Sequence, residues 1–121
     1  MKKIVLVVDD NRNNLILETD LLEFAGFTVF EAENAATGIA CAIKEKPDVI
    51  IMDIRLPDMR GSDAARILRK ETATSDIPIV FVTASVMPEG RIELQNISNS
   101  GFIGKPINTR TFAKEIEGYI K

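Results

Sequence analysis

Several residue types that carry chemistry in proteins are absent from this chain or rare in it. The 121 residues include no histidine, no tryptophan and one cysteine, Cys41. Without histidine, the serine and cysteine catalytic triads, histidine acid–base catalysis and the common zinc sites are excluded. A lone cysteine can form no disulfide within the chain. Any chemistry must therefore use carboxylates, hydroxyls and lysines.

The charge balance is mildly acidic. The chain has 15 basic and 18 acidic residues, a net charge of -3 and no polybasic run. This composition gives little to bind the phosphates of a nucleic acid. The longest early apolar run, Ile4–Val8, is too short for the apolar region of a signal peptide. We expect a cytoplasmic protein that binds neither nucleic acid nor membranes directly.

The length and composition predict a single folded domain, residues 1–121. A chain of 121 residues can bury one core but not two separate ones. Its 45% apolar and 27% charged residues are close to the average for soluble globular proteins, which excludes a disordered chain.

Two kinds of apolar segment alternate along the chain. Short runs rich in β-branched residues, without polar alternation, are typical of parallel strands covered on both faces. We expect strands at Ile4–Val8, Phe27–Glu31, Val49–Met52, Ile79–Val82 and Gly101–Ile103. Apolar residues at helical spacing lie between and after them, and we expect helices at Asn11–Ala25, Ala35–Lys46, Ser62–Lys70, Pro88–Asn99 and Thr109–Ile120. The alternation predicts a doubly wound (βα)5 fold of the α/β class, with helices on both faces of a parallel sheet.

Carboxylates, a hydroxyl and a lysine follow the expected strands. Asp9 and Asp10 come after the first strand and Asp53 after the third, while Thr83 follows the fourth and Lys105 the fifth. Because parallel strands end at one edge of the sheet, we expect the three carboxylates to converge there, where their repulsion calls for a cation. Oxygen ligands without histidine or cysteine favour Mg²⁺.

Four motifs at these strand ends resemble the receiver domains of two-component response regulators. They are Val8-Asp9-Asp10-Asn11, the segment from Met52 to Gly61, Val82-Thr83-Ala84, and the segment from Phe102 to Pro106. Their order and spacing match the CheY-like family over essentially the whole chain. The resemblance implies a flavodoxin-like sheet in the order 2-1-3-4-5, which periodicity alone does not give. It also implies a cis peptide bond between Lys105 and Pro106.

The resemblance implies a role for each residue at the strand ends. Asp53 resembles the phosphoacceptor, and Asp9 and Asp10 resemble the acidic pair that holds Mg²⁺ together with Asp53 and the backbone carbonyl of Arg55. Lys105 resembles the lysine that pairs with the phosphoryl group. A carboxylate is a poor nucleophile towards an anionic phosphoryl group, so positioning and charge neutralisation must promote the transfer. The chain would assist its own phosphorylation and dephosphorylation without being an enzyme in the usual sense.

Other positions resemble those that pass the signal on. Thr83 matches the switch hydroxyl, and Phe102 stands where many receivers carry tyrosine. In the family, inward movement of these two side chains alters the surface formed by the fourth helix, fifth strand and fifth helix. Arg55 and Ser85 lie where side chains influence the lifetime of the phosphorylated state, and an arginine can reach a neighbouring phosphoryl group.

Apolar residues beside the acidic pair suggest a docking patch. We expect Leu17, Leu21, Phe24 and Ala25 to form the buried stripe of the first helix, which leaves Leu15 and Ile16 exposed next to Pro106 and Ile107. In the family, the phosphodonor is a sensor histidine kinase or a histidine phosphotransfer protein. This chain has no histidine and can only be the recipient.

Alternative functions remain open from the sequence. An Asp-nucleophile phosphatase requires a second acid two residues after the nucleophile, where this chain has Arg55. A flavin or nucleotide binder requires a phosphate loop after the first strand, where Asp9 and Asp10 would repel a phosphate. A receiver-shaped scaffold without phosphorylation and a receiver excised from a larger regulator or hybrid kinase also remain. We expect a monomer or weak dimer whose output is binding to a downstream protein.

Overall fold

The computed structural model describes residues 2–83 and 97–120, and its central element is a parallel sheet of five strands. The strands are β1 (Ile4–Val8), β2 (Thr28–Ala32), β3 (Val49–Asp53), β4 (Ile79–Thr83) and β5 (Ser100–Gly104). Their order across the sheet is β2-β1-β3-β4-β5. This is the order that the resemblance implied.

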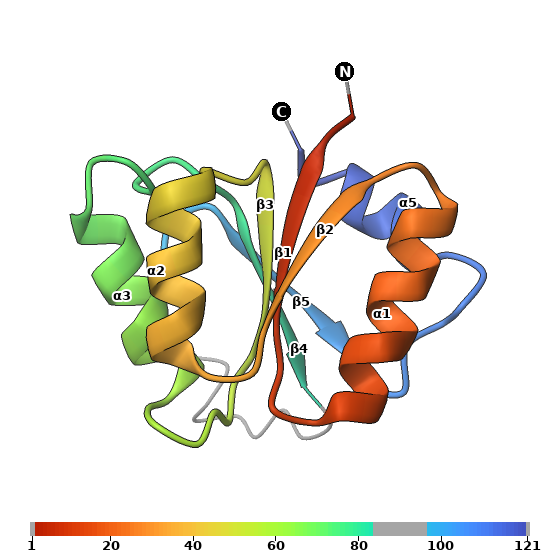
Figure 1. The fold of residues 1–121 in the computed structure, drawn as a ribbon, viewed down its shortest axis with the longest axis horizontal. Coiled ribbons are helices and arrows are strands. Elements are labelled where there is room, and N and C mark those ends of the chain that lie inside the picture. The colour runs from red at the N-terminus through yellow and green to blue at the C-terminus, as the bar shows by residue number, and fades with distance from the viewer. Residues whose placement is uncertain (1, 84–96, 121) are drawn as a thin grey trace.

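Helices cover both faces of the sheet (Figure 1). They are α1 (Arg12–Phe24), α2 (Ala35–Glu45), α3 (Gly61–Lys70) and α5 (Phe112–Glu117). Helices α2 and α3 lie side by side over one face, and α1 and α5 lie over the other. The predicted doubly wound α/β architecture is therefore confirmed.

Alternate residues of each strand supply two separate cores. In β1, Leu6 and Val8 face the core beneath α2 and α3, while Val5 and Val7 face the core beneath α1 and α5. All four side chains are at most 1% exposed. Because both faces of the sheet are covered, the strands need apolar residues at every position, and this explains their unbroken apolar sequence.

Helix boundaries agree with the sequence except at the last helix. We predicted a helix from Thr109, but α5 begins at Phe112. The amide of Thr111 donates to the carbonyl of Asn108 three residues before it, and the side chain of Asn108 accepts from the amide of Arg110, so residues 109–111 form a tight turn before the helix. The predicted helix at Pro88–Asn99 lies largely outside the described residues.

The buried stripe of α1 differs from the prediction. Leu15, Glu18, Thr19 and Leu22 face the core, whereas Leu17 is 41% exposed and Phe24 is 96% exposed. Leucines stand at several angles around this helix, so apolar spacing alone did not select its inner face. The expectation that Leu15 is exposed is wrong, since only 3% of it is accessible.

None of the helices in the described part of the chain has the length and apolarity required to span a membrane.

Candidate functional site

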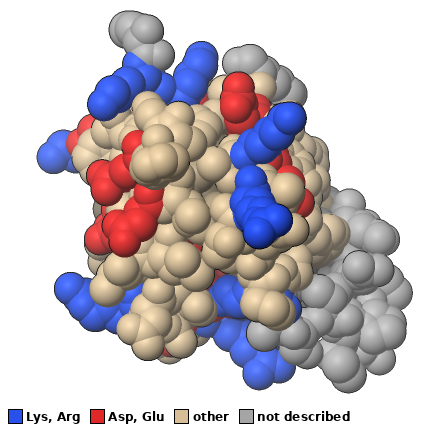
Figure 2. All heavy atoms as spheres, turned by 90° about the vertical axis from the view of Figure 1, so that its right-hand side faces the viewer, with Lys and Arg blue, Asp and Glu red and all other residues tan. Residues whose placement is uncertain are grey.

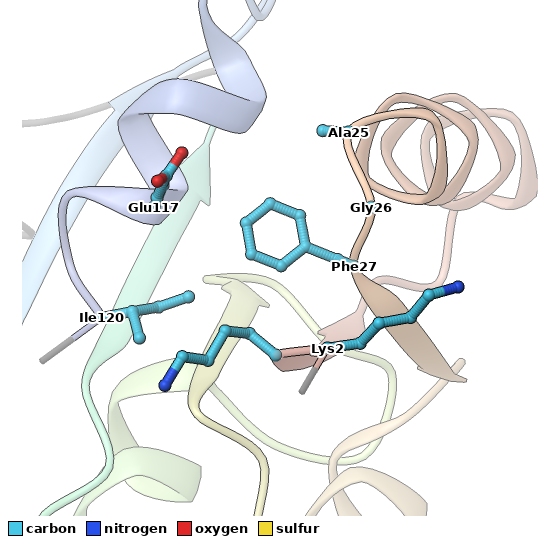
Figure 3. A pocket seen from close by; sticks show the side chains of 7 residues that line it. Lys2, Ala25, Gly26, Phe27, Glu117 and Ile120 are labelled. Atoms are coloured by element: carbon cyan, nitrogen blue, oxygen red, sulfur yellow. The ribbon is translucent and has the colours of Figure 1, made fainter.

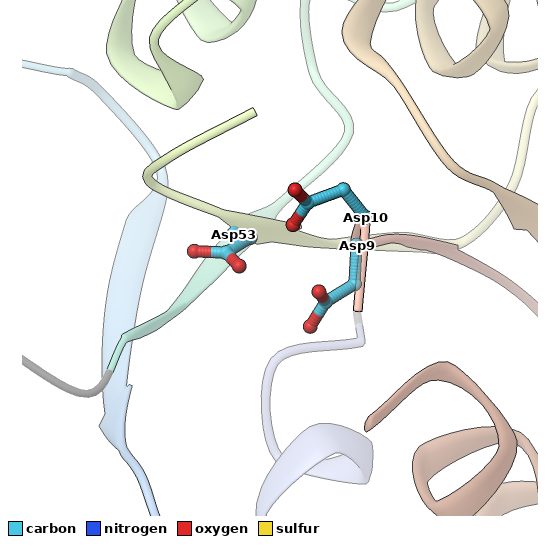
Figure 4. Close-up of side chains that lie close together, drawn as sticks. All are labelled: Asp9, Asp10 and Asp53. Carbon is cyan, nitrogen blue, oxygen red and sulfur yellow. The ribbon is translucent and has the colours of Figure 1, made fainter. Parts of the chain in front are cut away.

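Three carboxylates meet at the carboxyl ends of β1 and β3. Asp9 and Asp10 follow β1 directly, and Asp53 is the last residue of β3 (Figure 4). One carboxylate oxygen from each residue lies within 4.8 Å of the others. Asp9 is buried and also accepts from the backbone amide of Asn11 at 2.8 Å, whereas Asp10 is exposed. The predicted convergence of the three side chains is therefore present in the structure.

Lys105 places a positive charge between two of these carboxylates. Its Nζ atom lies 3.1 Å from Oδ2 of Asp9 and 3.4 Å from Oδ2 of Asp53. Burial by itself lowers the pKa of Lys105, but its hydrogen bond to Asp9 and its attraction to Asp53 outweigh burial, so the net shift is upward. The ammonium group therefore stays charged at neutral pH. The bond from Lys105 to Pro106 is cis, as the resemblance implied.

Asp53 occupies a partly buried position at the rim. Burial raises the pKa of its carboxyl group, while the backbone amide of Arg55, which donates to Oδ1 at 3.2 Å, and the charge of Lys105 oppose that shift. One carboxylate oxygen is thus held by Arg55 and the other by Lys105. The side chain is fixed in orientation at the edge of the sheet, and its charged form is poorly solvated.

The loop after Asp53 is held at both of its ends. Arg55 and Arg60 form an isolated antiparallel bridge, and the amide of Gly61 donates to the carbonyl of Ile54 at 2.7 Å. Asp58 accepts from the first amides of α2, Ala35 and Ala36, and these hydrogen bonds lower its pKa. The loop is thereby fastened both to itself and to the start of α2.

Gly61 packs directly against the backbone of Asp53. A Cβ atom at position 61 would collide with the carbonyl oxygen of Asp53 and lie 3.0 Å from Cα of Ile54. Because those neighbours are backbone atoms, they cannot move aside without shifting the end of β3. The glycine is therefore required by close approach.

We expect Gly61→Ala to lower the free energy of unfolding by about 1–3 kcal/mol, because it overpacks a backbone contact. Gly104→Ala is the matched control, since a Cβ atom there has no described heavy atom within 4 Å. Chemical denaturation of both variants measures the difference. Equal stability of the two variants would show that the contact at Gly61 is not tight.

The two residues assigned to the switch lie on the next two strands of the sheet, β4 and β5. Thr83 is the last residue of β4 and pairs in register with Gly104. Phe102 is half-buried in β5, and its ring centroid lies 6.3 Å from that of Phe81, in the core beneath α3. Phe102 thus stands at the border between core and surface.

The remaining predicted site residues are only partly brought together. The side chain of Arg55 is exposed, and Ser85 lies outside the described residues. Ile16 is 50% exposed, Pro106 is exposed and Ile107 is half-buried. Leu15 belongs to the core, whereas Pro106 and Ile107 line a pocket beside Lys105 together with Leu17 of α1, and Ile16 is not among the residues that line it.

Sequence reasoning missed Glu18, a buried carboxyl on the inner face of α1. It is 2% exposed and borders the same pocket as Lys105, Pro106 and Ile107. Burial raises the pKa of Glu18 to about 7, repulsion from Asp9 adds to the shift and the charge of Lys105 opposes it. Glu18 stands one turn before the buried Leu22, and this spacing was a visible signal, but assigning the inner face to Leu17 concealed it.

Glu18 is expected to make folding stability depend on pH. A carboxyl whose pKa rises from 4.5 to about 7 on folding stabilises the protein below pH 4.5, and this contribution is lost as the pH rises through 7. Glu18→Gln should therefore match the wild type near pH 5 and exceed its unfolding free energy near pH 8 by about 2–3 kcal/mol.

Denaturation in EDTA at both pH values measures this effect of Glu18. Asp20→Asn, an exposed acid on the same helix, is the control. Parallel pH profiles for the wild type and Glu18→Gln would contradict the expectation.

The donor set at the strand ends fits a magnesium ion. Three carboxylates lie within one small site, and histidine and cysteine ligands are absent from the cluster. Hard divalent cations prefer oxygen ligands, and Mg²⁺ commonly uses few carboxylates and keeps several waters. Asp9, Asp10 and Asp53 are the side chains that would hold it.

Three comparisons with known proteins agree with one another. Residues 5–117 match the model of the response regulator receiver domain. PilH of Pseudomonas aeruginosa is 34% identical over 96% of this chain and 96% of that protein. The polar-differentiation response regulator DivK of Brucella anthropi is 31% identical over 99% of this chain and 98% of its own. The chemotaxis response regulator CheY4 of Vibrio cholerae superposes with a TM-score of 0.92 at 28% identity, covering 99% of this chain and all of the other.

Proposed function

Because this chain belongs to the response regulator receiver domain family, we propose that Asp53 accepts a phosphoryl group and that this modification switches the protein between two binding states. The family is one of signalling switches and not of conventional enzymes. The observation that carries the proposal is the position of Asp53, whose carboxylate lies within one small cluster with Asp9 and Asp10 and beside the ammonium group of Lys105.

Phosphoryl transfer at this site is a displacement at phosphorus. A carboxylate oxygen of Asp53 forms a bond to phosphorus, and the bond from phosphorus to the donor's imidazole nitrogen breaks. The electron pair of that bond stays on the imidazole, which then takes up a proton from solvent. The product is an aspartyl phosphate, so the modified side chain gains negative charge and new acceptor oxygens.

Residues around Asp53 neutralise charge and position the nucleophile. Lys105 lies near Oδ2 of Asp53, from where it can pair with an oxygen of the incoming phosphoryl group. The amide of Arg55 holds the other carboxylate oxygen in place. When bound by Asp9, Asp10 and Asp53, Mg²⁺ supplies further positive charge for the phosphoryl oxygens. We assign the backbone carbonyl of Arg55 to the same ion.

The signal is proposed to leave the site through Thr83 and Phe102. Thr83 ends the strand beside β5, and Phe102 lies at the border of the core on β5. A hydroxyl that turns towards the phosphoryl oxygens leaves space that an aromatic ring can fill. The surface around β5 and α5 would then differ between the two states and select the downstream protein.

The proposed donor is a phosphohistidine of a sensor kinase or phosphotransfer protein. A pocket of about 290 Å³ lies beside Lys105, and its wall is formed by residues of α1 and of the loop after β5. These are Asn14, Leu17, Glu18, Pro106 and Ile107. Leu17, Pro106 and Ile107 offer the donor an apolar surface beside Lys105, and we propose that exposed Ile16 of the same helix extends the contact with the donor. DivK, of which this chain covers 98%, is a response regulator by name, and we propose that this chain acts as a receiver in the cytoplasm.

The lifetime of the phosphorylated state is proposed to depend on Arg55 and Ser85. The exposed guanidinium of Arg55 follows Asp53 by two residues and is free to approach a phosphoryl group there. We expect Arg55→Ala to change the dephosphorylation rate by about threefold to tenfold, which corresponds to about 0.7–1.4 kcal/mol, the usual net contribution of one hydrogen bond. Intact mass measured over time gives the rate at which phosphate is lost. An unchanged half-life would show that Arg55 does not influence dephosphorylation.

Acetyl phosphate provides a direct test of the proposed function. Incubation with Mg²⁺ should add one phosphoryl group to the wild type, as read by intact mass, and EDTA should prevent it. An Asp-nucleophile phosphatase would instead turn over the acetyl phosphate repeatedly and release phosphate at a steady high rate. A receiver-shaped scaffold would show neither uptake nor turnover, and that outcome would contradict the proposal.

A further inference from the structure

A second pocket lies at the end of the sheet opposite the acidic cluster. It has a volume of about 780 Å³ and borders the start of β1, the end of α1, the start of β2 and the end of α5. Phe27 points into the space between the end of α1 and the segment that carries Glu117 and Ile120 (Figure 3). Lys2 and Lys3 also line it. Phe27 and Ile120 give this pocket an apolar floor. The ammonium groups of Lys2 and Lys3 outnumber the single carboxylate of Glu117, so its rim is positive.

The neighbouring end of α1 carries the opposite chemistry. Phe24 is 96% exposed, the largest exposed fraction among the large apolar side chains that the structure describes. Asp20 and Glu23 precede it by four residues and by one, and both are exposed. Asp20 and Phe24 stand one helical turn apart, so an acidic group and an aromatic ring share one side of the helix. This segment, Asp20 to Phe24, is here called the α1 tip.

The charges of the two features have no partners within the described chain. Neither Asp20 nor Glu23 forms an ion pair with a described residue, and the ammonium groups of Lys2 and Lys3 form none either. Figure 2 shows this side of the molecule, on which lysine and arginine side chains at the upper left lie above a group of acidic side chains, with further basic side chains at the right and at the bottom. Opposite charges thus lie near each other on one face, and they form no ion pair with each other in the described part of the chain.

We propose that a second copy of this chain occupies the basic pocket, with the α1 tip of each copy inserted into the pocket of the other. The tip and the pocket are adjacent, since Ala25 and Gly26 follow Phe24 directly and line the pocket. A surface that contains both a knob and its complementary hole can pair with itself about a two-fold axis, because each contact then occurs twice. Phe24 would be the buried aromatic anchor of the interface.

This interface is independent of the proposed phosphorylation. The pocket lies at the amino-terminal end of β1, and the acidic cluster lies at its carboxyl-terminal end. A dimer formed here leaves Asp53 open to a donor, because the pocket and the acidic cluster lie at opposite ends of the sheet. Asp53→Asn should therefore dimerise as the wild type does, so failure of the dimer and failure of the switch are distinguishable.

Sedimentation of the untagged protein from micromolar to millimolar concentration tests the dimer. The wild type should show a reversible monomer–dimer equilibrium, and Phe24→Ser should weaken it at least about tenfold, as expected for loss of a buried aromatic anchor. Ile67→Ser is the matched control, because Ile67 is 39% exposed on α3, which covers the opposite face of the sheet. A wild type that stays monomeric throughout overturns the proposal and leaves the pocket to a different partner.

Charge reversal identifies the contact itself. Glu23→Lys should be monomeric, and the double variant Lys2→Glu with Lys3→Glu should be monomeric too, because each places like charges at both copies of the contact. An equimolar mixture of the two should form a heterodimer, in which both contacts regain opposite charges. Adding Phe24→Ser to both chains should abolish that heterodimer. A mixture that stays monomeric, or one that associates regardless of Phe24, contradicts the proposed arrangement.

Discussion

Asp53→Asn is expected to abolish phosphoryl uptake completely while leaving the fold intact. The amide side chain has nearly the shape of the carboxylate but no anionic oxygen to attack phosphorus. Asp9 is poorly placed to replace it, because Asp9 is 2% exposed and its oxygens already accept from Asn11 and Lys105. Intact mass after incubation with acetyl phosphate and Mg²⁺ measures the uptake.

The free energy of unfolding distinguishes this loss of function from misfolding. Burial raises the pKa of Asp53, which means that the folded state disfavours its charged form. Asp53→Asn removes that charge, so its free energy of unfolding at pH values above neutrality should be no lower than that of the wild type. Asp63→Asn, at an exposed acid on α3, is the control for uptake. Normal phosphoryl uptake by Asp53→Asn would show that another residue is the acceptor.

Lys105→Met is expected to slow phosphoryl transfer from acetyl phosphate by about 10²–10³-fold, the usual effect of removing one group that stabilises developing charge. Methionine keeps the length and apolar stem of lysine but has no ammonium group. Mg²⁺ at saturating concentration should not restore the rate, because the ion would be held by its own ligands, Asp9, Asp10 and Asp53, and would not replace the lost ammonium group. The initial rate of mass increase is the measurement.

Lys105→Met should also cost stability, since Asp9 would keep its burial and lose its ionic partner. Leaving a buried acceptor unpaired costs about 1–3 kcal/mol. The two effects are separable, because the rate is measured on folded protein and denaturation reports the stability. Lys114→Met, at an exposed lysine on α5, should change neither quantity. An unchanged transfer rate in Lys105→Met would show that Lys105 does not promote phosphoryl transfer.

Much of the site followed from the sequence because the fold places it by a simple rule. Strands covered on both faces have continuous apolar sequences, so β1 and β3 were located from their residue types alone. Parallel strands end at a common edge, so the sequence alone predicts that Asp9 and Asp53 lie close together. The order of the strands did not follow from periodicity and came from the resemblance of the motifs.

The features that the sequence concealed depend on the rotation of helices and on close approaches. The direction in which α1 faces the sheet decides between Leu15 and Leu17, and both are leucines, so apolar spacing alone gave no preference. Once Leu15 faces the core, Glu18 does so too, which is how a carboxyl became buried near Lys105. The need for glycine at Gly61 arises from a contact with the backbone of Asp53 that only the folded loop creates.

Chemical mapping of the acyl phosphate tests the central claim most directly. Borohydride reduces an aspartyl phosphate to homoserine, so peptide mass spectrometry after phosphorylation and reduction marks the modified position. The expected result is homoserine at residue 53 alone, formed with Mg²⁺ and not with EDTA. Homoserine at Asp9 or Asp10, or an unmodified Asp53 in protein that has taken up phosphate, would contradict the account.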